Sequence, residues 1–388
     1  MTMAEVRKLT VLFVNNSYSV FGGATRSLFD LIESAKDMIT PIVLLKEKGA
    51  VYEYLTSRGV ECIVHNFSSI VRPSLHYSIT KGKLLTHPWR YWLIKVVRHD
   101  ISCVRFVKRE MRDRRIDLVH SNTTTVVIGY KIARVLGVKH VWHVRENLVN
   151  EYFGKEKVVR SSLARKLVFK TDARIVISNS CKKYWGFTDI NTWVLPDAVR
   201  FREDCCYIKE KEPYYLFCTW GLCEAKGASF AIRAFGLSGM AAKGMSLKLV
   251  GNASDDYIAE LKGIASEYGC EDSVSFMLLQ DDVKTLYAHA TAFLQPSENE
   301  GMGRTTVEAM FYGCPVIGRA SGGTSDLIED GETGYLFNTD EECAELMKRV
   351  CSDNQSELIL KAQDCVKHNC SIEDYGDKLI HIYNTVLQ

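Results

Sequence analysis

The sequence predicts an α/β protein with two doubly wound parallel sheets. Along its 388 residues, short apolar runs alternate with segments that have helical periodicity. Within the runs, apolar residues do not alternate with polar ones, as expected for parallel strands buried on both faces. A charged stretch without periodicity at 196–213 separates the runs into two series. We therefore expect two domains, each with its own sheet, joined by this stretch as a linker.

The first series predicts an N-terminal domain over residues 1–200, with strands at 9–14, 41–45, 60–65, 117–120, 139–144, 174–178 and 192–195. The second series predicts a C-terminal domain over residues 201–371, with strands at 214–218, 246–250, 273–277, 291–295 and 315–318. In open α/β sheets, ligands bind beyond the carboxyl ends of the strands. Two such domains that face each other would enclose a cleft.

Composition and charge narrow the class of protein. The chain is 46% hydrophobic, enough for two separate cores. Residues 1–200 contain 33 Lys and Arg against 17 Asp and Glu, whereas the remainder contains 16 against 30. This asymmetry predicts that the first domain faces an anionic partner. Thirteen cysteines without C-x2-C pairs indicate reduced thiols in a cytoplasm, and no apolar run approaches the length of a membrane span.

The segment 296–310, Pro-Ser-Glu-Asn-Glu-Gly-Met-Gly-Arg-Thr-Thr-Val-Glu-Ala-Met, carries the strongest indication of function. It follows a predicted strand, and its turn Gly301-Met302-Gly303 opens a helix. Free backbone N–H groups at the start of a helix bind phosphate, and glycine allows the chain to approach a ligand closely. The segment therefore predicts an anion site.

Two carboxylates flank this turn. Glu300 precedes the helix, and Glu308 lies about a turn inside it. Because helical side chains lean toward the N-terminus, Glu308 points back toward the same site as Glu300. Two carboxylates would repel a diphosphate, so they fit better as acceptors for neutral hydroxyls. One would hold a ribose and the other a donor sugar, although a solvated Glu and a charge at a helix start explain the same residues.

The segment resembles the retaining glycosyltransferase family 4 pattern, in which a serine-containing loop carries an E-x7-E motif. The resemblance continues through 313–318, 321–326 and 330–334, and the pair Lys226-Gly227 is similar to the family's phosphate-binding lysine and glycine. It implies the GT-B architecture, two Rossmann-like domains facing across a cleft, with a last helix at about 372–388 returning to the first domain. Members of this type build bacterial cell-surface polysaccharides.

Two positions in the N-terminal half also match the family. Gly22-Gly23 falls where the family has its glycine-rich loop, and His143 falls where it has its active-site histidine. From the residues alone, the glycine pair is either a plain turn or a diphosphate contact, and a lone histidine is more often structural. The resemblance favours the site role for both. It implies that His143 hydrogen-bonds the sugar rather than acting as a base.

The resemblance implies transfer of a sugar, with retention, from a nucleoside diphosphate donor to a glycan or a polyprenyl-linked acceptor. We expect UDP as the nucleotide. Glu300 would hold the donor sugar, Glu308 the ribose and Lys226 the departing diphosphate. The family usually has an arginine shortly before that lysine, which this chain lacks, and we expect Arg304 to supply its charge. No D-x-D string occurs, so we expect no metal cofactor.

Two other functions stay open. A non-catalytic nucleotide-sugar-binding protein on the same fold is compatible with the missing arginine, with Asp197-Ala198 in place of the family's Asn-Gly, and with Asp326 in place of its glutamate. An inverting GT-B transferase or an epimerase would use a carboxylate as base. The E-x7-E motif disfavours that second alternative.

The stretch 81–115 is strongly basic, with 11 Lys and Arg against three acidic residues. Trp89, Tyr91 and Trp92 lie among these charges, a pattern typical of a helix on an anionic membrane surface. A solvated helical face explains the same pattern equally well. No known nucleic-acid module is present, so we expect no nucleic-acid partner. We expect a cytoplasmic protein that is peripheral on the inner face of the membrane.

Overall fold

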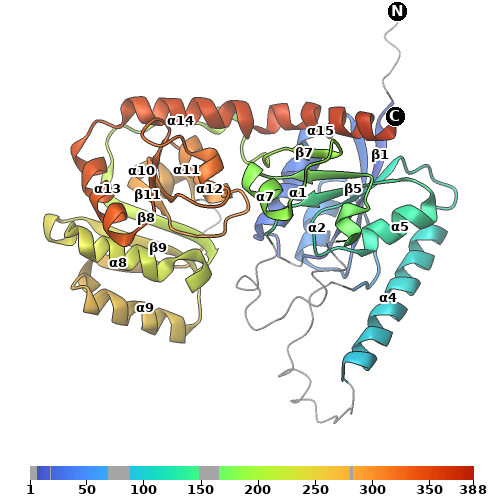
Figure 1. Cartoon of the computed structure of the whole chain (residues 1–388), viewed down its shortest axis with the longest axis horizontal. Coiled ribbons are helices and arrows are strands. Elements are labelled where there is room, and N and C mark those ends of the chain that lie inside the picture. Colours follow the sequence, from blue (N-terminus) through green and yellow to red (C-terminus); the bar gives the residue numbers. More distant parts are fainter. Residues whose placement is uncertain (1–6, 18, 69–87, 148–165, 280–282) are drawn as a thin grey trace, which may run out of the picture. The chain divides into compact units, whose positions relative to one another are not determined.

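The computed structural model describes residues 7–17, 19–68, 88–147, 166–279 and 283–388, and side chains from residue 97 in the helix that begins at Pro88. The chain forms two compact units. Unit 1 comprises Met1–Ile177, Lys182–Leu195 and Tyr375–Gln388, and unit 2 comprises Ser178–Cys181 and Pro196–Asp374. Each unit contains one parallel sheet (Figure 1).

The sheet of unit 1 has seven strands in the order β3-β2-β1-β4-β5-β6-β7. The strands are β1 (Leu9–Asn15), β2 (Ile39–Leu45), β3 (Glu61–Val64), β4 (Leu118–Ser121), β5 (Lys139–Val144), β6 (Ala173–Val176) and β7 (Thr192–Val194). The helices are α1 (Gly23–Ser34), α2 (Ala50–Thr56), α4 (Pro88–Glu110), α5 (Ile128–Leu136), α7 (Asn179–Trp185) and α15 (Ile372–Leu387), of which α7 and α15 also include residues of unit 2.

Both faces of this sheet are buried, which explains its continuous apolar runs. On one face, Leu12 and Val14 of β1 belong to a core cluster that also contains Val107 of α4 and Ile132 of α5. On the other face, Phe13 packs against the His120 ring, with ring centroids 5.2 Å apart. The chain leaves β1 toward β2 and β3, and later returns on the other side at β4. This change of direction is the switch point where such sheets bind ligands.

The sheet of unit 2 has six strands in the order β10-β9-β8-β11-β12-β13. The strands are β8 (Glu212–Gly221), β9 (Ser246–Asn252), β10 (Val274–Met277), β11 (Ala290–Gln295), β12 (Val316–Arg319) and β13 (Tyr335–Phe337). The main helices are α8 (Ala228–Ser238), α9 (Asp255–Glu267), α10 (Lys284–His289), α11 (Arg304–Phe311), α12 (Thr324–Leu327), α13 (Asp340–Ser352) and α14 (Ser356–Asn369). The switch point lies between β8 and β11.

The predicted fold class, with two doubly wound parallel sheets, is confirmed. Every predicted strand is present, and among the strands of the described residues β13 is the one that was not predicted. The stretch 196–213, predicted to be a linker, lies in unit 2, where the Val199 N–H donates to the Cys370 carbonyl at 2.9 Å. Residues 81–87 of the basic stretch and the side chains of 88–96, which include Trp89, Tyr91 and Trp92, lie outside the described residues. Among the helices that the structure describes, none has the length and hydropathy of a membrane span.

Candidate functional site

Two loops meet at the switch point of unit 2. The 3-10 turn Glu224–Lys226 follows β8, and residues 296–303 follow the neighbouring strand β11. Gly227 ends the first loop with φ of 79°, a left-handed conformation that favours glycine. A Cβ atom at this position would lie only 2.8 Å from Pro296 Cγ. Gly227 is therefore required both for the turn and for the close packing that brings Lys226 to the second loop.

Lys226 and Glu300 form an ion pair, with Nζ 2.6 Å from Oε1. Their side chains are 22% and 13% exposed, so the pair is largely shielded while one side remains open to solvent. The sequence predicted both residues for the site, and the structure brings them together. Glu300 fixes the position of the ammonium group by accepting from one of its three N–H donors.

The turn 301–303 packs against a second glycine pair, Gly322-Gly323. The Gly323 N–H donates to the Glu300 carbonyl at 2.8 Å, and a Cβ atom at Gly323 would lie 2.4 Å from Met302 Cα. Gly303 caps the N-terminus of α11 with φ of 98° and no side-chain hydrogen bond. The start of α11 therefore has no side-chain cap, as is typical of a helix start that binds an anion.

The side chain of Met302 is buried beneath the turn. The side chain is 3% exposed, and its sulfur accepts a hydrogen bond from the Asp197 N–H at 3.1 Å. The Gly301 carbonyl accepts a hydrogen bond from the Ser178 hydroxyl at 2.6 Å. These two hydrogen bonds hold the turn in one conformation.

Glu308 is buried in α11 and paired with Arg200, whose Nη2 lies 2.8 Å from Glu308 Oε1. The Nε–H of Arg200 donates to the Tyr312 hydroxyl at 2.5 Å. Arg200 was not predicted from the sequence, because a single arginine in a stretch without periodicity does not indicate a binding site. A carboxylate has about four acceptor positions, so Glu308 retains capacity for further hydroxyl donors.

Arg304 is the first residue of α11, and its Nη1 donates to the Ala198 carbonyl at 3.0 Å. This bond holds the side chain against the segment that also contains Arg200. A guanidinium has five N–H donors, and this contact uses one of them. The role of Arg304 at a diphosphate stays a prediction.

The predicted residues of unit 1 lie near the carboxyl ends of β1 and β5. Gly22 is the N-cap of α1 and Gly23 its first residue, with no side-chain capping bond. A Cβ atom at Gly22 would meet nothing closer than 3.6 Å, so the structure itself does not require glycine there. At the end of β1, Asn15 accepts a hydrogen bond from Asn122 Nδ2 at 3.2 Å. The glycine pair therefore belongs to a polar, uncapped helix start.

His143 is fully buried near the end of β5. Burial, together with the nearby Arg145 guanidinium, lowers its pKa well below the usual value. The imidazole is therefore neutral at physiological pH, which fits a hydrogen-bonding role and not that of a cation. Glu146 has the opposite shift, since burial raises the pKa of its carboxyl despite the hydrogen bonds from Thr124.

No group of three or more His, Cys, Asp or Glu side chains is placed to hold a metal ion within the described ranges.

Two Rossmann-like units, with a paired lysine and glutamate beside a glycine turn at the switch point of the second, are the arrangement of the GT-B fold class. Residues 207–367 match the model of the glycosyl transferases group 1, and residues 50–189 match that of glycosyltransferase family 4. The chain therefore belongs to the family 4 type of glycosyltransferases, as the resemblance predicted.

An uncharacterized glycosyltransferase of Haemophilus influenzae is 32% identical over 146 residues, which are 37% of this chain and 40% of that protein. The matched segment thus spans less than half of this curated relative. HepE of Anabaena, crystallised with UDP and glucose, is 21% identical with a TM-score of 0.75, over 97% of this chain and 100% of HepE. TarM of S. aureus, crystallised with UDP, is 12% identical with a TM-score of 0.76 over 97% and 100%. These likenesses support the GT-B fold.

Proposed function

We propose that this protein is a retaining glycosyltransferase that moves a sugar from a UDP donor to a hydroxyl of a glycan or lipid-linked acceptor. The observation that carries this proposal is the Lys226–Glu300 ion pair beside the uncapped start of α11. It combines a cation, a carboxylate and backbone N–H donors at one switch point, as a sugar linked to a diphosphate requires. The UDP and glucose named for HepE support the choice of donor.

In this reaction the leaving diphosphate gains negative charge as the bond to the sugar breaks. Groups fixed in advance at that position stabilise the transition state most. Lys226 and the N–H groups of 301–303 supply this stabilisation, with Arg304 as a second cation. Since the sequence has no D-x-D string, we assign the charge to these residues and to no metal ion.

The two glutamates have different partners, and this difference supports different roles. Glu300 is half-buried next to the lysine, so it is assigned to the hydroxyls of the donor sugar. Glu308 is nearly enclosed, and Arg200 already neutralises its charge, so it is assigned to the ribose hydroxyls. His143 is neutral and is assigned a hydrogen bond to the sugar. Gly22 and Gly23 are assigned to the diphosphate through their N–H groups.

Thermal stabilisation by a panel of UDP- and GDP-sugars tests the donor, because a bound ligand raises the melting temperature by mass action. Hydrolysis of the stabilising nucleotide sugar by pure protein then tests catalysis. We expect stabilisation and slow hydrolysis with one UDP-sugar. Stabilisation with no turnover, even with glycan acceptors, would favour the non-catalytic alternative, and no stabilisation by any member would contradict the nucleotide-sugar proposal itself.

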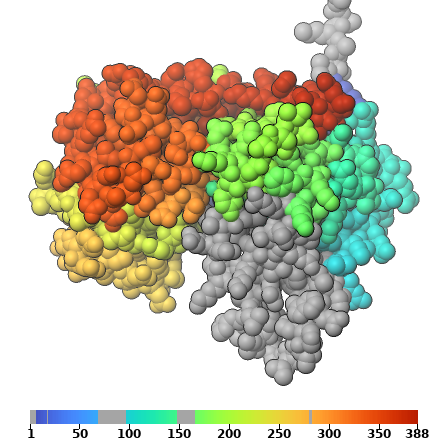
Figure 2. Space-filling model, viewed as in Figure 1, coloured from blue at the N-terminus to red at the C-terminus, as the bar shows by residue number. Residues whose placement is uncertain are grey.

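We also propose that unit 1 binds an anionic membrane surface, where a lipid-linked acceptor is presented. A hollow of about 510 Å³ lies between the C-terminal half of α4, the loop after it and the turn between α5 and β5. Its basic lining residues are Arg105, Lys108, Arg109, Arg112, Arg114 and Arg115. Its apolar lining residues are Met111, Ile116, Val135, Leu136 and Val138. In Figure 2, the colours of α4 and α5 lie together on the surface of unit 1.

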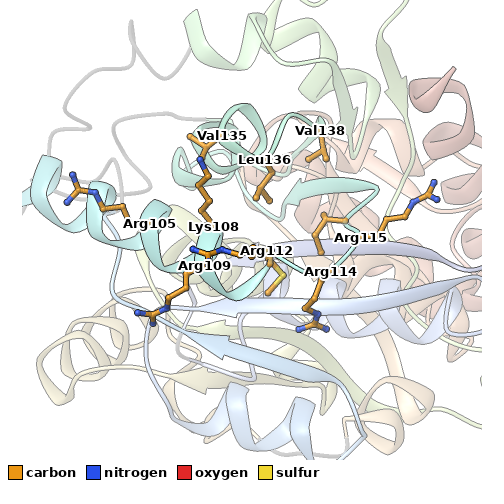
Figure 3. Close-up of a pocket in the computed structure, with 11 residues that line it drawn as sticks. Arg105, Lys108, Arg109, Arg112, Arg114, Arg115, Val135, Leu136 and Val138 are labelled. Atoms are coloured by element: carbon orange, nitrogen blue, oxygen red, sulfur yellow. The ribbon is translucent and has the colours of Figure 1, made fainter.

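Not every charge of this hollow is neutralised. Arg114 pairs with Glu61 and Arg115 with Asp117, whereas no ion pair of Arg105, Lys108 or Arg112 occurs within the described part of the chain. Figure 3 shows the Lys108 side chain reaching toward Val135, while those of Arg105 and Arg109 point away from the centre. Exposed Val97 and Ile101 precede Arg105 at four-residue intervals on α4, so apolar and basic side chains share one helix face. Such a face suits anionic headgroups.

Sedimentation with liposomes that contain anionic lipid tests this surface at low and high ionic strength. We expect binding at low salt that collapses as the Debye length falls from about 30 Å at 0.01 M to about 3 Å at 1 M. Arg105→Glu, Lys108→Glu and Arg112→Glu together should abolish it. The matched control replaces exposed Lys166, Lys170 and Lys183 by Glu, an equal change of charge elsewhere in unit 1. A parent protein that stays in the supernatant, or equal loss in both variants, contradicts this surface.

A further inference from the structure

A buried chain of hydrogen-bonding side chains connects α15 to His143 inside unit 1. The hydroxyl of Tyr383 on α15 lies 2.6 Å from His120 Nδ1 on β4. The opposite nitrogen of that ring, Nε2, lies 3.3 Å from His143 Nδ1 on β5. All three side chains are fully buried. Buried polar chains of this kind need every donor to meet an acceptor, which restricts where their protons can be.

Arg145 determines which ring nitrogen of His143 carries the proton. Its Nη2 lies 3.2 Å from His143 Nδ1, and a guanidinium can only donate. His143 Nδ1 is therefore an acceptor. Since the ring is neutral, its proton must be on Nε2. Burial and the neighbouring cation keep the pKa of both His120 and His143 far below the usual value, in agreement with two neutral rings.

The positions of the His120 and Tyr383 protons follow from the tautomer of His143. His120 Nε2 lies 3.3 Å from the same acceptor, so it carries the proton of its ring and shares the Nδ1 lone pair with Arg145, and His120 Nδ1 is then an acceptor. The Tyr383 hydroxyl is consequently a donor. Burial raises the pKa of Tyr383, which keeps this hydroxyl protonated. With the opposite tautomer of His120, two lone pairs would face each other between the histidines, although the Tyr383 hydroxyl could then accept from Nδ1–H.

The segment of α15 that carries Tyr383 is itself closely seated on unit 1. A Cβ atom at Gly376 would lie 2.1 Å from the Ser34 carbonyl oxygen at the end of α1. Tyr375 and Leu379 of the same helix are buried as well. The packing of α15 against α1 therefore sets the position of the Tyr383 hydroxyl.

We propose that Tyr383 and His120 are positioning residues, which fix the plane of the His143 ring that Arg145 keeps as the neutral Nε2–H tautomer. The C-terminal helix thereby sets the direction of the donor group that His143 presents. The catalytic consequence rests on the proposed function, in which that N–H bonds the donor sugar. The tautomer does not rest on it and can be measured without any turnover.

The test is ¹⁵N NMR of protein labelled at its histidine rings, in which protonated and unprotonated ring nitrogens have distinct shifts. Signals of His120 and His143 are assigned by their loss in His120→Gln and His143→Gln. In the parent we expect Nε2 protonated and Nδ1 unprotonated in both rings. Tyr383→Phe removes the donor to His120 Nδ1, so it should shift the Nδ1 signals of His120 and His143 while Nε2 stays protonated in both rings. Tyr375→Phe removes a hydroxyl from the same helix and should leave both rings unchanged.

Kinetics adds a second, independent readout. Tyr383→Phe should lower kcat for donor hydrolysis about tenfold with little change in KM, since the N–H is misdirected while the nucleotide site is intact. His120→Gln keeps an N–H donor toward His143 and should retain more activity than His120→Leu. If Tyr383→Phe leaves both histidine spectra as in the parent, or if Tyr375→Phe perturbs them equally, the proposal is wrong. An inactive parent with the expected spectra would instead contradict the proposed function alone.

Discussion

The ammonium nitrogen of Lys226 lies 2.6 Å from Glu300 Oε1, which makes the proposed phosphate-binding cation and sugar-binding carboxylate one unit. Each residue limits the rotamers of the other. A donor that enters this site finds a cation already held in place, so little reorganisation is needed when the diphosphate departs. Substitution of either partner should therefore affect both the charge and the order of the site.

Lys226→Ala should lower kcat more than it raises KM for the donor. The charge matters most when the leaving group becomes more negative, and removal of one prepositioned donor costs roughly 100- to 1,000-fold in kcat. Steady-state hydrolysis or transfer with the UDP-sugar measures both constants. Lys243→Ala, an exposed lysine of the same unit, is the control. Equal kcat in a folded Lys226→Ala protein would show that another group carries the charge.

Glu308→Ala should weaken nucleotide binding, because a ribose contact is made in the ground state and the transition state alike. Loss of one charge-assisted hydrogen bond costs about 1.5 to 3 kcal/mol, or roughly 10- to 150-fold in affinity. The defect should appear in KM for the donor and in UDP binding by calorimetry. Unchanged UDP affinity would exclude Glu308 from the site.

Arg200 and Glu308 should also be coupled in stability. Either single substitution, Arg200→Met or Glu308→Gln, leaves a charged or polar partner in a largely buried position and should lower the melting temperature. The double variant should lose less free energy of unfolding than the sum of the two, with an interaction term of about 0.5 to 3 kcal/mol. Additive losses would mean that the 2.8 Å contact contributes nothing to the fold.

The sequence predicts those parts of the fold and the site that depend on a local pattern of residues. Strands such as β1 and β11 were predictable because an apolar run buried on both faces is a local property of the chain. β13 was missed because three residues, Tyr335–Phe337, are too short to show a pattern. Lys226, Glu300 and the turn 301–303 were predictable because each follows a strand and, as a set, they match a known family pattern.

Other parts of the site depend on tertiary contacts that no local pattern encodes. Arg200 meets Glu308 across 108 positions of the chain, and Tyr383 meets His120 across 263. The inward direction of the Met302 side chain depends on its contact with Asp197. Without an alignment, pairs this distant in sequence give no sign that they will touch. The structure alone supplied them.

Acidification should destabilise the fold through three buried histidines of unit 1. Burial lowers the pKa of His120 and His143 well below the usual value and that of His140 to about 3. In the unfolded chain these rings regain a pKa of about 6.5. Above that pH both states are neutral and stability is unaffected. Below it, the unfolded state binds protons that the native state does not, so stability falls as the pH falls.

Each of these histidines should contribute about 1.4 kcal/mol per pH unit below 6.5, so the three together should cost about 4 kcal/mol between pH 7.5 and 5.5. Urea unfolding at the two pH values measures this loss. The raised pKa of Glu146 lets the native state bind a proton as the pH falls, which offsets part of the loss of stability. The total loss of the parent therefore does not measure the histidines alone. The decisive comparison is His140→Gln, whose own loss over this interval should be smaller by about 1.4 kcal/mol. Asn369→Gln, at an exposed position on α14, changes no titrating group and should retain the parent's loss. An identical loss in His140→Gln would show that His140 is protonated in the native state as readily as in the unfolded chain.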